Sequence, residues 1–318
     1  MTTLHTLDQK LLDQRLTSGL APALSMRARY NTPVMAKFIA SKFQVGEPIS
    51  SRNSQVKSAE YWDADMQSYM YLQDFVNTVP SWQEQFREVV VQANDRYGKG
   101  LDHEIEEILE LAPEREERFM EIMDQDDADG AANYWLGMLQ ISPDRNPATY
   151  LMMRVGRRIG EHVVMCLKGY FRAPRPSQLC PAVLPMIDPP GTPSLPAGHA
   201  VQAYLMSYLL AYSLPNIPQQ TTPNNLDTAT GPLFDLAYRV SQNRVVAGLH
   251  YPIDITAGRA VGIACFDALQ DVASIWGDRE SETGELERQP VAARLTRDTS
   301  LEARSLRARV REEFPQYK

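Results

Sequence analysis

The spacing of apolar residues limits the fold of this chain more than any other property. Along most of the 318 residues, apolar side chains recur every three or four positions, and no run alternates apolar and polar residues as a half-buried strand would. A chain of this length can bury a sizeable core. We therefore predict an all-α fold in the form of a helical bundle.

Prolines, glycines and charged turns divide this helical pattern into segments. We expect helices at residues 4–16, 58–78, 81–97, 103–124, 131–141, 146–172, 198–214, 232–248 and 252–276. The chain becomes more apolar after residue 130 and charge-dense after residue 276. These changes predict an N-terminal helical layer at residues 1–130, a core at residues 131–276 and a charged tail with one solvated helix at residues 277–318.

Composition restricts the partners and the compartment. A formal net charge of −8 gives no reason to expect nucleic acid or an anionic membrane as the main partner. The N-terminus lacks the pattern of a secretory signal, and the longest mostly apolar run, at residues 204–214, is too short to span a bilayer. The widely spaced Cys166, Cys180 and Cys265 are typical of free thiols in a reducing compartment. We expect a cytoplasmic protein that acts on a small molecule, and a homodimer through the N-terminal helices would be unsurprising.

Basic residues in three short segments have the chemistry of an oxyanion site. Lys168 and Arg175 lie seven residues apart, about two helical turns, so we expect them to share a helix face. Arg244 follows in a later helix. One guanidinium group can donate two parallel hydrogen bonds to the oxygens of a phosphoryl group, and an ammonium group adds a point charge. These three cations therefore predict a site for phosphate or vanadate.

Two histidines add acid–base and nucleophilic chemistry to the cations. His199 follows Gly198 at the start of an apolar helix, whose N-terminal amides attract an anion. Gly198 permits close approach of the backbone, and His199 is well placed to protonate a leaving oxygen. Asp254, four residues after His250, can hold one imidazole nitrogen and leave the other free to attack phosphorus or to bind a metal.

The motifs around these residues resemble those of the type 2 phosphatidic acid phosphatase and vanadium haloperoxidase superfamily. Its pattern is K-x6-R-P, then P-S-G-H, then S-R-x5-H-x3-D, and the resemblance covers residues 130–276. The resemblance implies a helical bundle around the anion. It gives His250 the role of nucleophile or vanadium ligand, His199 that of acid and base, and Asp254 that of supporting acid. The anion-binding positions that it implies are Lys168, Arg175, Gly198 and Arg244.

Two positions depart from the family pattern. Ala197 replaces the serine whose hydroxyl donates to the anion, and Asn243 replaces the serine before Arg244. A lost charge-assisted hydrogen bond is worth about 1.5–3 kcal/mol, so we expect Ala197 to weaken anion binding without abolishing it. We expect Asn243 to affect supporting contacts more than the chemistry.

Four functions are compatible with these residues. Short spacing between the motifs favours a phosphatase that hydrolyses a phosphate or diphosphate ester through a phosphohistidine at His250 and needs no cofactor. The alternatives are a vanadium-dependent haloperoxidase that uses vanadate, hydrogen peroxide and halide, a terpene synthase-like enzyme that ionises a prenyl diphosphate in an apolar pocket, and a non-catalytic anion-binding protein. Chloride-oxidising members would have bulky aromatics where this chain has Met165 and Thr192.

Two further charged groups are interpreted as solvated. Residues 124–127 spell the D-x-D-D pattern of protonating terpene cyclases, but a short acidic pattern between helices is more often solvated. Arg154, Arg157 and Arg158 line one helix ahead of the motifs. They could recognise a second phosphate, but charges on a helix surface are more often plain solvated groups.

Overall fold

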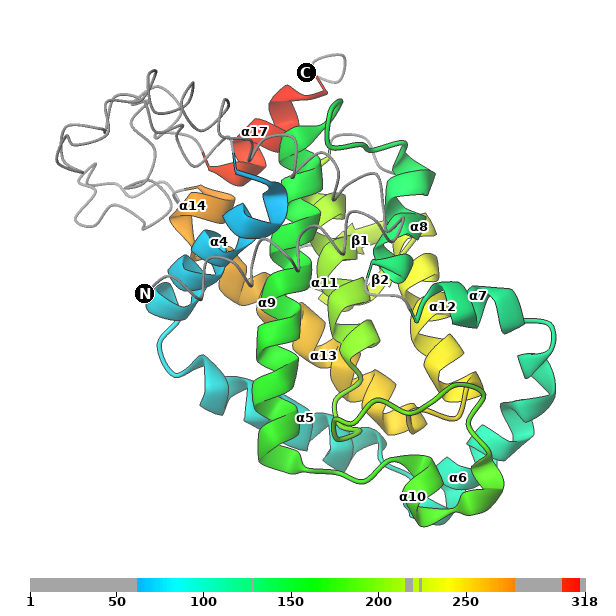
Figure 1. Cartoon of the computed structure of the whole chain (residues 1–318). Coiled ribbons are helices and arrows are strands. Elements are labelled where there is room, and N and C mark those ends of the chain that lie inside the picture. Colours follow the sequence, from blue (N-terminus) through cyan, green and yellow to red (C-terminus); the bar gives the residue numbers. More distant parts are fainter. Residues whose placement is uncertain (1–61, 127–128, 215–219, 223–224, 278–304, 315–318) are drawn as a thin grey trace, which may run out of the picture. The chain divides into compact units, whose positions relative to one another are not determined.

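The computed structural model describes residues 62–126, 129–214, 220–222, 225–277 and 305–314 (Figure 1). Contacts divide the chain into one unit at residues 1–57 and another at residues 58–318, so every described residue belongs to the second unit. These residues are mostly helical with almost no strands, which confirms the predicted all-α fold class. The helix expected at residues 4–16 lies outside the described residues, and the division at residues 130 and 276 stays a prediction.

Along the described part of the chain, helices follow one another with one pair of strands between them. The first half of the described chain contains α4 (Ala64–Thr78), α5 (Trp82–Tyr97), α6 (Leu101–Leu111), η3 (Ala112–Arg115), α7 (Phe119–Asp124) and α8 (Gly130–Leu139). The second half contains α9 (Pro147–Phe171), α10 (Pro176–Leu179), η4 (Pro181–Val183), α11 (Gly198–Ser213), α12 (Pro232–Val246), α13 (Pro252–Leu269), α14 (Ala273–Trp276) and α17 (Leu306–Glu312). Within the described ranges, the strands are β1 (Gln220–Thr222) and β2 (Asn225–Thr230), which form an antiparallel pair between α11 and α12.

These boundaries confirm most of the expected helices and correct three expectations. The single helix expected at residues 103–124 ends at Leu111, because Pro113, which has no N–H group, falls in the first turn of η3. The helix expected at residues 252–276 ends at Leu269 and is followed by the separate α14. The pairing of β1 with β2 is not predicted by the sequence, since strands of three and six residues show too little alternation.

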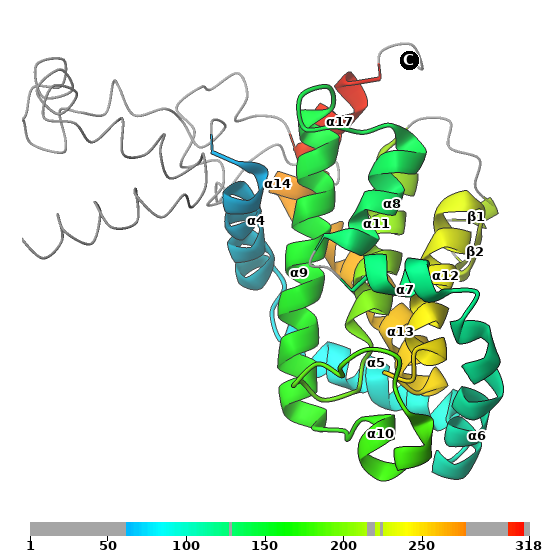
Figure 2. The same ribbon diagram turned by 45° about the vertical axis from the view of Figure 1, so that its right-hand side comes forward.

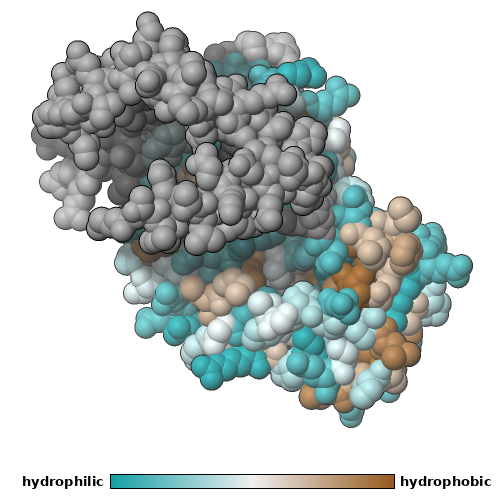
Figure 3. All heavy atoms as spheres, viewed as in Figure 1, coloured by the Kyte–Doolittle hydropathy of each residue, from teal (hydrophilic) through white to brown (hydrophobic). Residues whose placement is uncertain are grey.

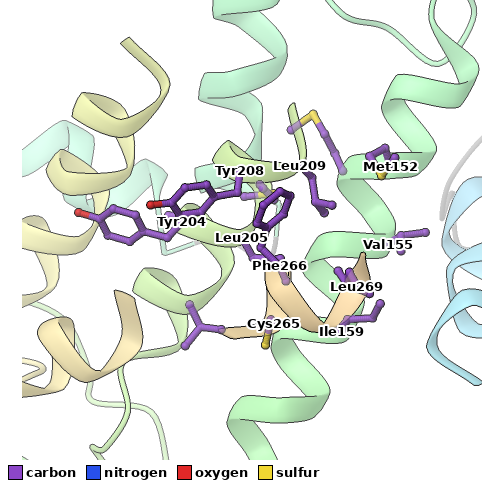
Figure 4. Packing of buried hydrophobic residues seen from close by; sticks show 14 of the residues in the cluster. Met152, Val155, Ile159, Tyr204, Leu205, Tyr208, Leu209, Cys265, Phe266 and Leu269 are labelled. Atoms are coloured by element: carbon purple, nitrogen blue, oxygen red, sulfur yellow. The ribbon is translucent and has the colours of Figure 1, made fainter. Parts of the chain in front are cut away.

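Helix α11 is the centre of the core. It packs against α9, α12 and α13 (Figures 1 and 2), and most of its side chains are buried on every side. A helix that is apolar all round is stable only inside a protein. Figure 4 shows the surrounding cluster, in which Tyr208 of α11 stacks on Phe266 of α13 with ring centroids 5.3 Å apart. The position of α11 therefore determines where the ends of its neighbours lie.

Glycines let α13 approach the start of α11. A Cβ atom at Gly258 would lie 2.8 Å from the carbonyl oxygen of Ala197, and one at Gly262 would lie 3.0 Å from that of Val201. The amide of Ala197 also donates to the carbonyl of Asp254 at 3.0 Å. The N-terminal ends of α11 and α13 are therefore fixed side by side.

Helix α17 packs on α9, so the expectation of a solvated helix in the tail is wrong. Leu306 and Val310 are buried in the main core cluster. The carboxylate of Glu313 accepts from the amides of Ala148 at 2.6 Å and Thr149 at 3.1 Å, in the first turn of α9. Amides at a helix start have no acceptor within the helix, so a carboxylate there is stabilising.

In the described ranges, no helix combines the length and the apolar composition that crossing a membrane requires. Helix α9 has 25 residues, more than the roughly 20 that span a bilayer core, but it contains three arginines and Lys168. On the face in Figure 3, hydrophilic and hydrophobic residues are interspersed where the described residues are visible. The charged positions of α9 therefore suit contacts with protein and water.

The close approach of α13 to α11 predicts that Gly258→Ala is destabilising. The new Cβ would meet a backbone oxygen that cannot move alone, so the helices must separate, and we expect the free energy of unfolding to fall by about 1–3 kcal/mol. Gly169→Ala on α9 is the control, because a Cβ there meets nothing within 4 Å. Gly169→Ala should raise the free energy of unfolding by about 0.5–1 kcal/mol. Urea unfolding measures both, and equal values for the two variants would contradict the proposed packing.

Candidate anion-binding site

Lys168 and Arg175 approach each other because the chain leaves α9 between them. Helix α9 ends at Phe171, and Arg172 has φ 51°, the left-handed conformation that often terminates a helix. Arg175 then directly precedes Pro176, the first residue of α10. The expectation that Lys168 and Arg175 share a helix face is therefore wrong. The turn after α9, not a helical repeat, brings the two cations together.

The loop before α11 holds both of these cations. Lys168 Nζ donates to the carbonyl of Pro193 and, at 2.9 Å, to that of Ser194. Arg175 Nε donates to the carbonyl of Thr192 at 2.9 Å, and Arg175 Nη2 donates to the Thr192 hydroxyl at 3.2 Å. Both cationic side chains are buried. Their positions are thus set by backbone carbonyls rather than by carboxylates.

His250 lies in the turn before α13, and its two ring nitrogens contact Asp254 and Arg175. Nδ1 is 3.0 Å from Asp254 Oδ2, which also accepts from the Ser194 hydroxyl and, at 3.1 Å, from the Tyr251 amide. An ionised carboxylate can only accept, so Nδ1 has the proton and Nε2 has the lone pair. Nε2 lies 3.0 Å from Arg175 Nη1. The lone pair of His250 therefore faces a cation predicted to bind an oxyanion.

His199 lies in the first turn of α11, as the sequence predicts. Ala197 is the N-cap and has no side-chain oxygen, so the amides of Gly198 and His199 have no acceptor within the helix. His199 Nε2 is 3.0 Å from the carbonyl oxygen of Gln125. Because a carbonyl only accepts, Nε2 has a proton, and Nδ1 is the nitrogen left to exchange one with a substrate.

Arg244 is fully buried and has unused donors. Its Nη2 donates to the carbonyl of Ile122 at 3.0 Å and to Gln125 Oε1 at 3.3 Å. Its Nη1 lies 3.8 Å from a carboxylate oxygen of Asp126, too far for a hydrogen bond. Among the residues that the structure describes, Arg244 Nε and Nη1 have no hydrogen-bond partner. Buried donors without acceptors are costly, so this arrangement fits an anion that would supply the missing acceptors.

Gln125 connects His199 with Arg244, a role that no motif in the sequence indicates. Its side chain is buried, and Oε1 accepts from Asn243 Nδ2 at 3.0 Å as well as from Arg244. Its side-chain nitrogen Nε2 donates to Glu121 Oε1 at 3.3 Å. Asn243 therefore makes a supporting contact, as expected. Nothing in the sequence distinguishes Gln125 from the exposed acids beside it, and the same holds for Ser194.

Burial lowers the pKa of each of these basic groups. It lowers the pKa of Lys168 to about 7 and that of Arg244 to about 10. Burial also lowers the pKa of His250 to about 4. It lowers the pKa of His199 to about 3, with further contributions from Arg244, His250 and Lys168. Arg244, His250 and Lys168 therefore lie close enough to His199 to affect its protonation.

The three arginines of α9 form ion pairs, so their interpretation as plain solvated groups is wrong. Arg154 and Arg157 share the carboxylate of Asp129, and Arg154 and Arg158 share that of Asp65. The arginine side chains are 14–20% exposed. These pairs connect α9 to α4 and to the start of α8.

A comparison with protein-family models gives a match to part of the chain. The sequence model of the PAP2 superfamily matches residues 150–270, which confirms the resemblance drawn from the motifs. Members of this superfamily are typically phosphoester hydrolases. A comparison with the curated proteins finds no match. The matched range includes all seven predicted site positions, whereas Gln125 and Ile122 lie outside it.

The low pKa of Lys168 predicts that anion affinity falls as pH rises through about 7. A dianion attracts the protonated amine, so binding must be accompanied by proton uptake above this pKa, and affinity should fall up to about tenfold per pH unit. Sulfate is a suitable probe because it stays doubly charged between pH 6 and 9. Calorimetric titration over that range should show the decline, and Lys168→Met should remove it. An equal decline in the variant would assign the titration to another group.

The contacts of Gln125 predict that Gln125→Leu destabilises the protein and weakens sulfate binding. Arg244 and Asn243 each lose a buried acceptor, which costs about 1–3 kcal/mol in the free energy of unfolding. Gln92→Leu is the matched control, because Gln92 is exposed and its side chain donates to Glu88 on its own helix. Its effect should stay within about 0.5 kcal/mol. Equal effects of both substitutions on stability and sulfate affinity would contradict a role of Gln125 in the site.

Proposed function

We propose that this chain, in which residues 150–270 form a PAP2 superfamily domain, hydrolyses a phosphate ester through a phosphohistidine at His250. One observation supports this most strongly. Asp254 holds Nδ1 of His250, and the lone pair of Nε2 faces the guanidinium of Arg175. A phosphoryl group bound by Arg175 would therefore lie against the nitrogen that can attack it.

In the first step, Nε2 of His250 attacks phosphorus and the bond from phosphorus to the leaving oxygen breaks. Lys168, Arg175, Arg244 and the amide of Gly198 would neutralise the charge that spreads over the phosphoryl oxygens. His199, in its protonated form, gives its Nδ1 proton to the leaving oxygen. The products of this step are an alcohol and a phosphoryl group bound to His250.

In the second step, a water molecule attacks phosphorus and the bond to His250 breaks. His199 takes the proton of that water, so the acid form of His199 is restored. The net reaction converts a phosphate ester and water into an alcohol and phosphate. Burial keeps His199 neutral in the free protein, but a bound dianion has the opposite effect and raises its pKa. Substrate binding would thus supply the protonated acid that the first step requires.

Vanadate, the cofactor of the haloperoxidase alternative, would be held by the same residues. The unused donors of Arg244 and the lone pair of His250 suit any tetrahedral oxyanion. Bound vanadate would supply activation of hydrogen peroxide for halide oxidation. The hydroxyl of Thr192 supports Arg175, and Met165 is 49% exposed, so neither position provides the buried aromatic expected for chloride oxidation. Bromination of a dye by hydrogen peroxide, with and without orthovanadate, tests this alternative.

Product analysis separates the two remaining alternatives. An enzyme that ionises a prenyl diphosphate releases inorganic diphosphate with a hydrocarbon or an alcohol, whereas a phosphatase releases orthophosphate. A non-catalytic anion-binding protein binds sulfate and releases neither product. Assays of p-nitrophenyl phosphate and a panel of diphosphates therefore distinguish all three.

The phosphohistidine predicts a covalent intermediate that can be trapped. Rapid acid-free quenching with labelled substrate should give a base-stable, acid-labile phosphoprotein, and His250→Ala should give none. His199→Ala should still be labelled but should turn over about 10²- to 10⁴-fold more slowly, because it lacks the acid and base. His103→Ala, at an exposed position of α6, is the control and should behave as the wild type. Labelling that persists in His250→Ala would rule out this mechanism.

A further inference from the structure

A cavity of about 110 Å³ lies beside His199. It extends along α11 from His199 past the next two turns and is bounded by α9 and by the start of α8. The lining residues are Asp126, Ala131, Ala132, Arg157, His199, Gln202, Ala203 and Met206. Of the seven predicted site residues, His199 is the one that lines this cavity. If His199 protonates the leaving oxygen, the leaving group of a bound ester has this cavity beside it.

The cavity has both polar and apolar lining. Asp126 offers acceptors, Arg157 offers donors and Gln202 offers both. Alanines and Met206 form the rest of the lining. Arg157 is held in place by Asp129, and its side chain is 20% exposed. Such a lining suits a group that presents both hydroxyls and carbon-bound hydrogens.

We propose that this cavity selects a short, uncharged polyol as the leaving group, so that the substrate class is a polyol phosphate of about the size of glycerol phosphate. The proposal rests on the proposed function, because it assumes that His199 faces the leaving oxygen. Arg157 and Gln202 are its specificity-determining residues. Neither belongs to the three motifs on which the family resemblance depends.

The size of the cavity favours a small leaving group. Pockets for drug-sized ligands hold about 300–1,000 Å³, whereas a cavity for one water molecule needs at least about 10–15 Å³. A space of about 110 Å³ therefore suits a group of only a few heavy atoms. A prenyl or acyl chain would have to leave this cavity through one of its sides.

The charges of the cavity disfavour a second phosphate there. The carboxylate of Asp126 would lie next to the added anion, and like charges repel. Arg157 already shares Asp129 with Arg154, so its charge is partly compensated. Hydroxyl groups can instead donate to Asp126 and accept from Arg157 without any change in net charge. The cavity therefore discriminates a polyol from a diphosphate.

Three substrates test the proposal in the wild-type protein: glycerol 2-phosphate, p-nitrophenyl phosphate and pyrophosphate. We expect kcat/KM for glycerol 2-phosphate to exceed that for pyrophosphate at least tenfold. A preference for pyrophosphate would overturn the inference and leave the phosphatase activity standing. Release of phosphate from none of the three would instead refute the proposed function, and the inference would fall with it.

Variants of the lining residues test the recognition itself. We expect Gln202→Leu and Arg157→Met each to lower the ratio of kcat/KM for glycerol 2-phosphate to that for p-nitrophenyl phosphate at least tenfold. Arg158→Met is the matched control, because Arg158 lies on the same helix and pairs with Asp65 without lining the cavity. Its ratio should equal that of the wild type. Thermal unfolding checks that each variant is folded, and an unchanged ratio in folded Gln202→Leu would overturn the proposal.

Discussion

The hydrogen bond between the amide of Ala197 and the carbonyl of Asp254 joins the two helix starts on which the site depends. The closeness that this bond requires is possible because Gly258 has no side chain to hold α13 away from α11. His199 and the amides of the first turn belong to the start of α11. His250 and its partner Asp254 lie at the start of α13. The distance between the proposed acid and the proposed nucleophile is thus a consequence of backbone packing.

The cations around this pair are buried before any anion binds. Lys168 and Arg175 are held by loop carbonyls, which neutralise no charge, and Arg244 keeps donors without partners among the described residues. This burial lowers the pKa of Lys168 and that of Arg244. An oxyanion would supply both charge and acceptors, so the proposed function predicts that the protein is more stable with an oxyanion bound.

Local chemistry made several parts of the site predictable from the sequence. Helix type and the Asp254 partner of His250 both follow from short-range patterns. Prediction failed where partners are distant in the chain. The contacts of Gln125 with His199 and Arg244 span more than 70 residues, and no periodicity reports them. Pro113 lies within the segment whose apolar spacing predicts one helix at residues 103–124, and that spacing does not indicate the break there.

The residues at the end of α7 limit how residues 150–270 could be transferred from one protein to another. Backbone and side-chain acceptors of Ile122 and Gln125 complete the surroundings of Arg244 and His199, yet both residues precede the range that matches the superfamily. A fragment limited to residues 150–270 would bury a guanidinium and an imidazole without these acceptors. The range that matches the superfamily is therefore shorter than the segment needed to surround Arg244 and His199. Recombination would have to transfer the end of α7 together with residues 150–270.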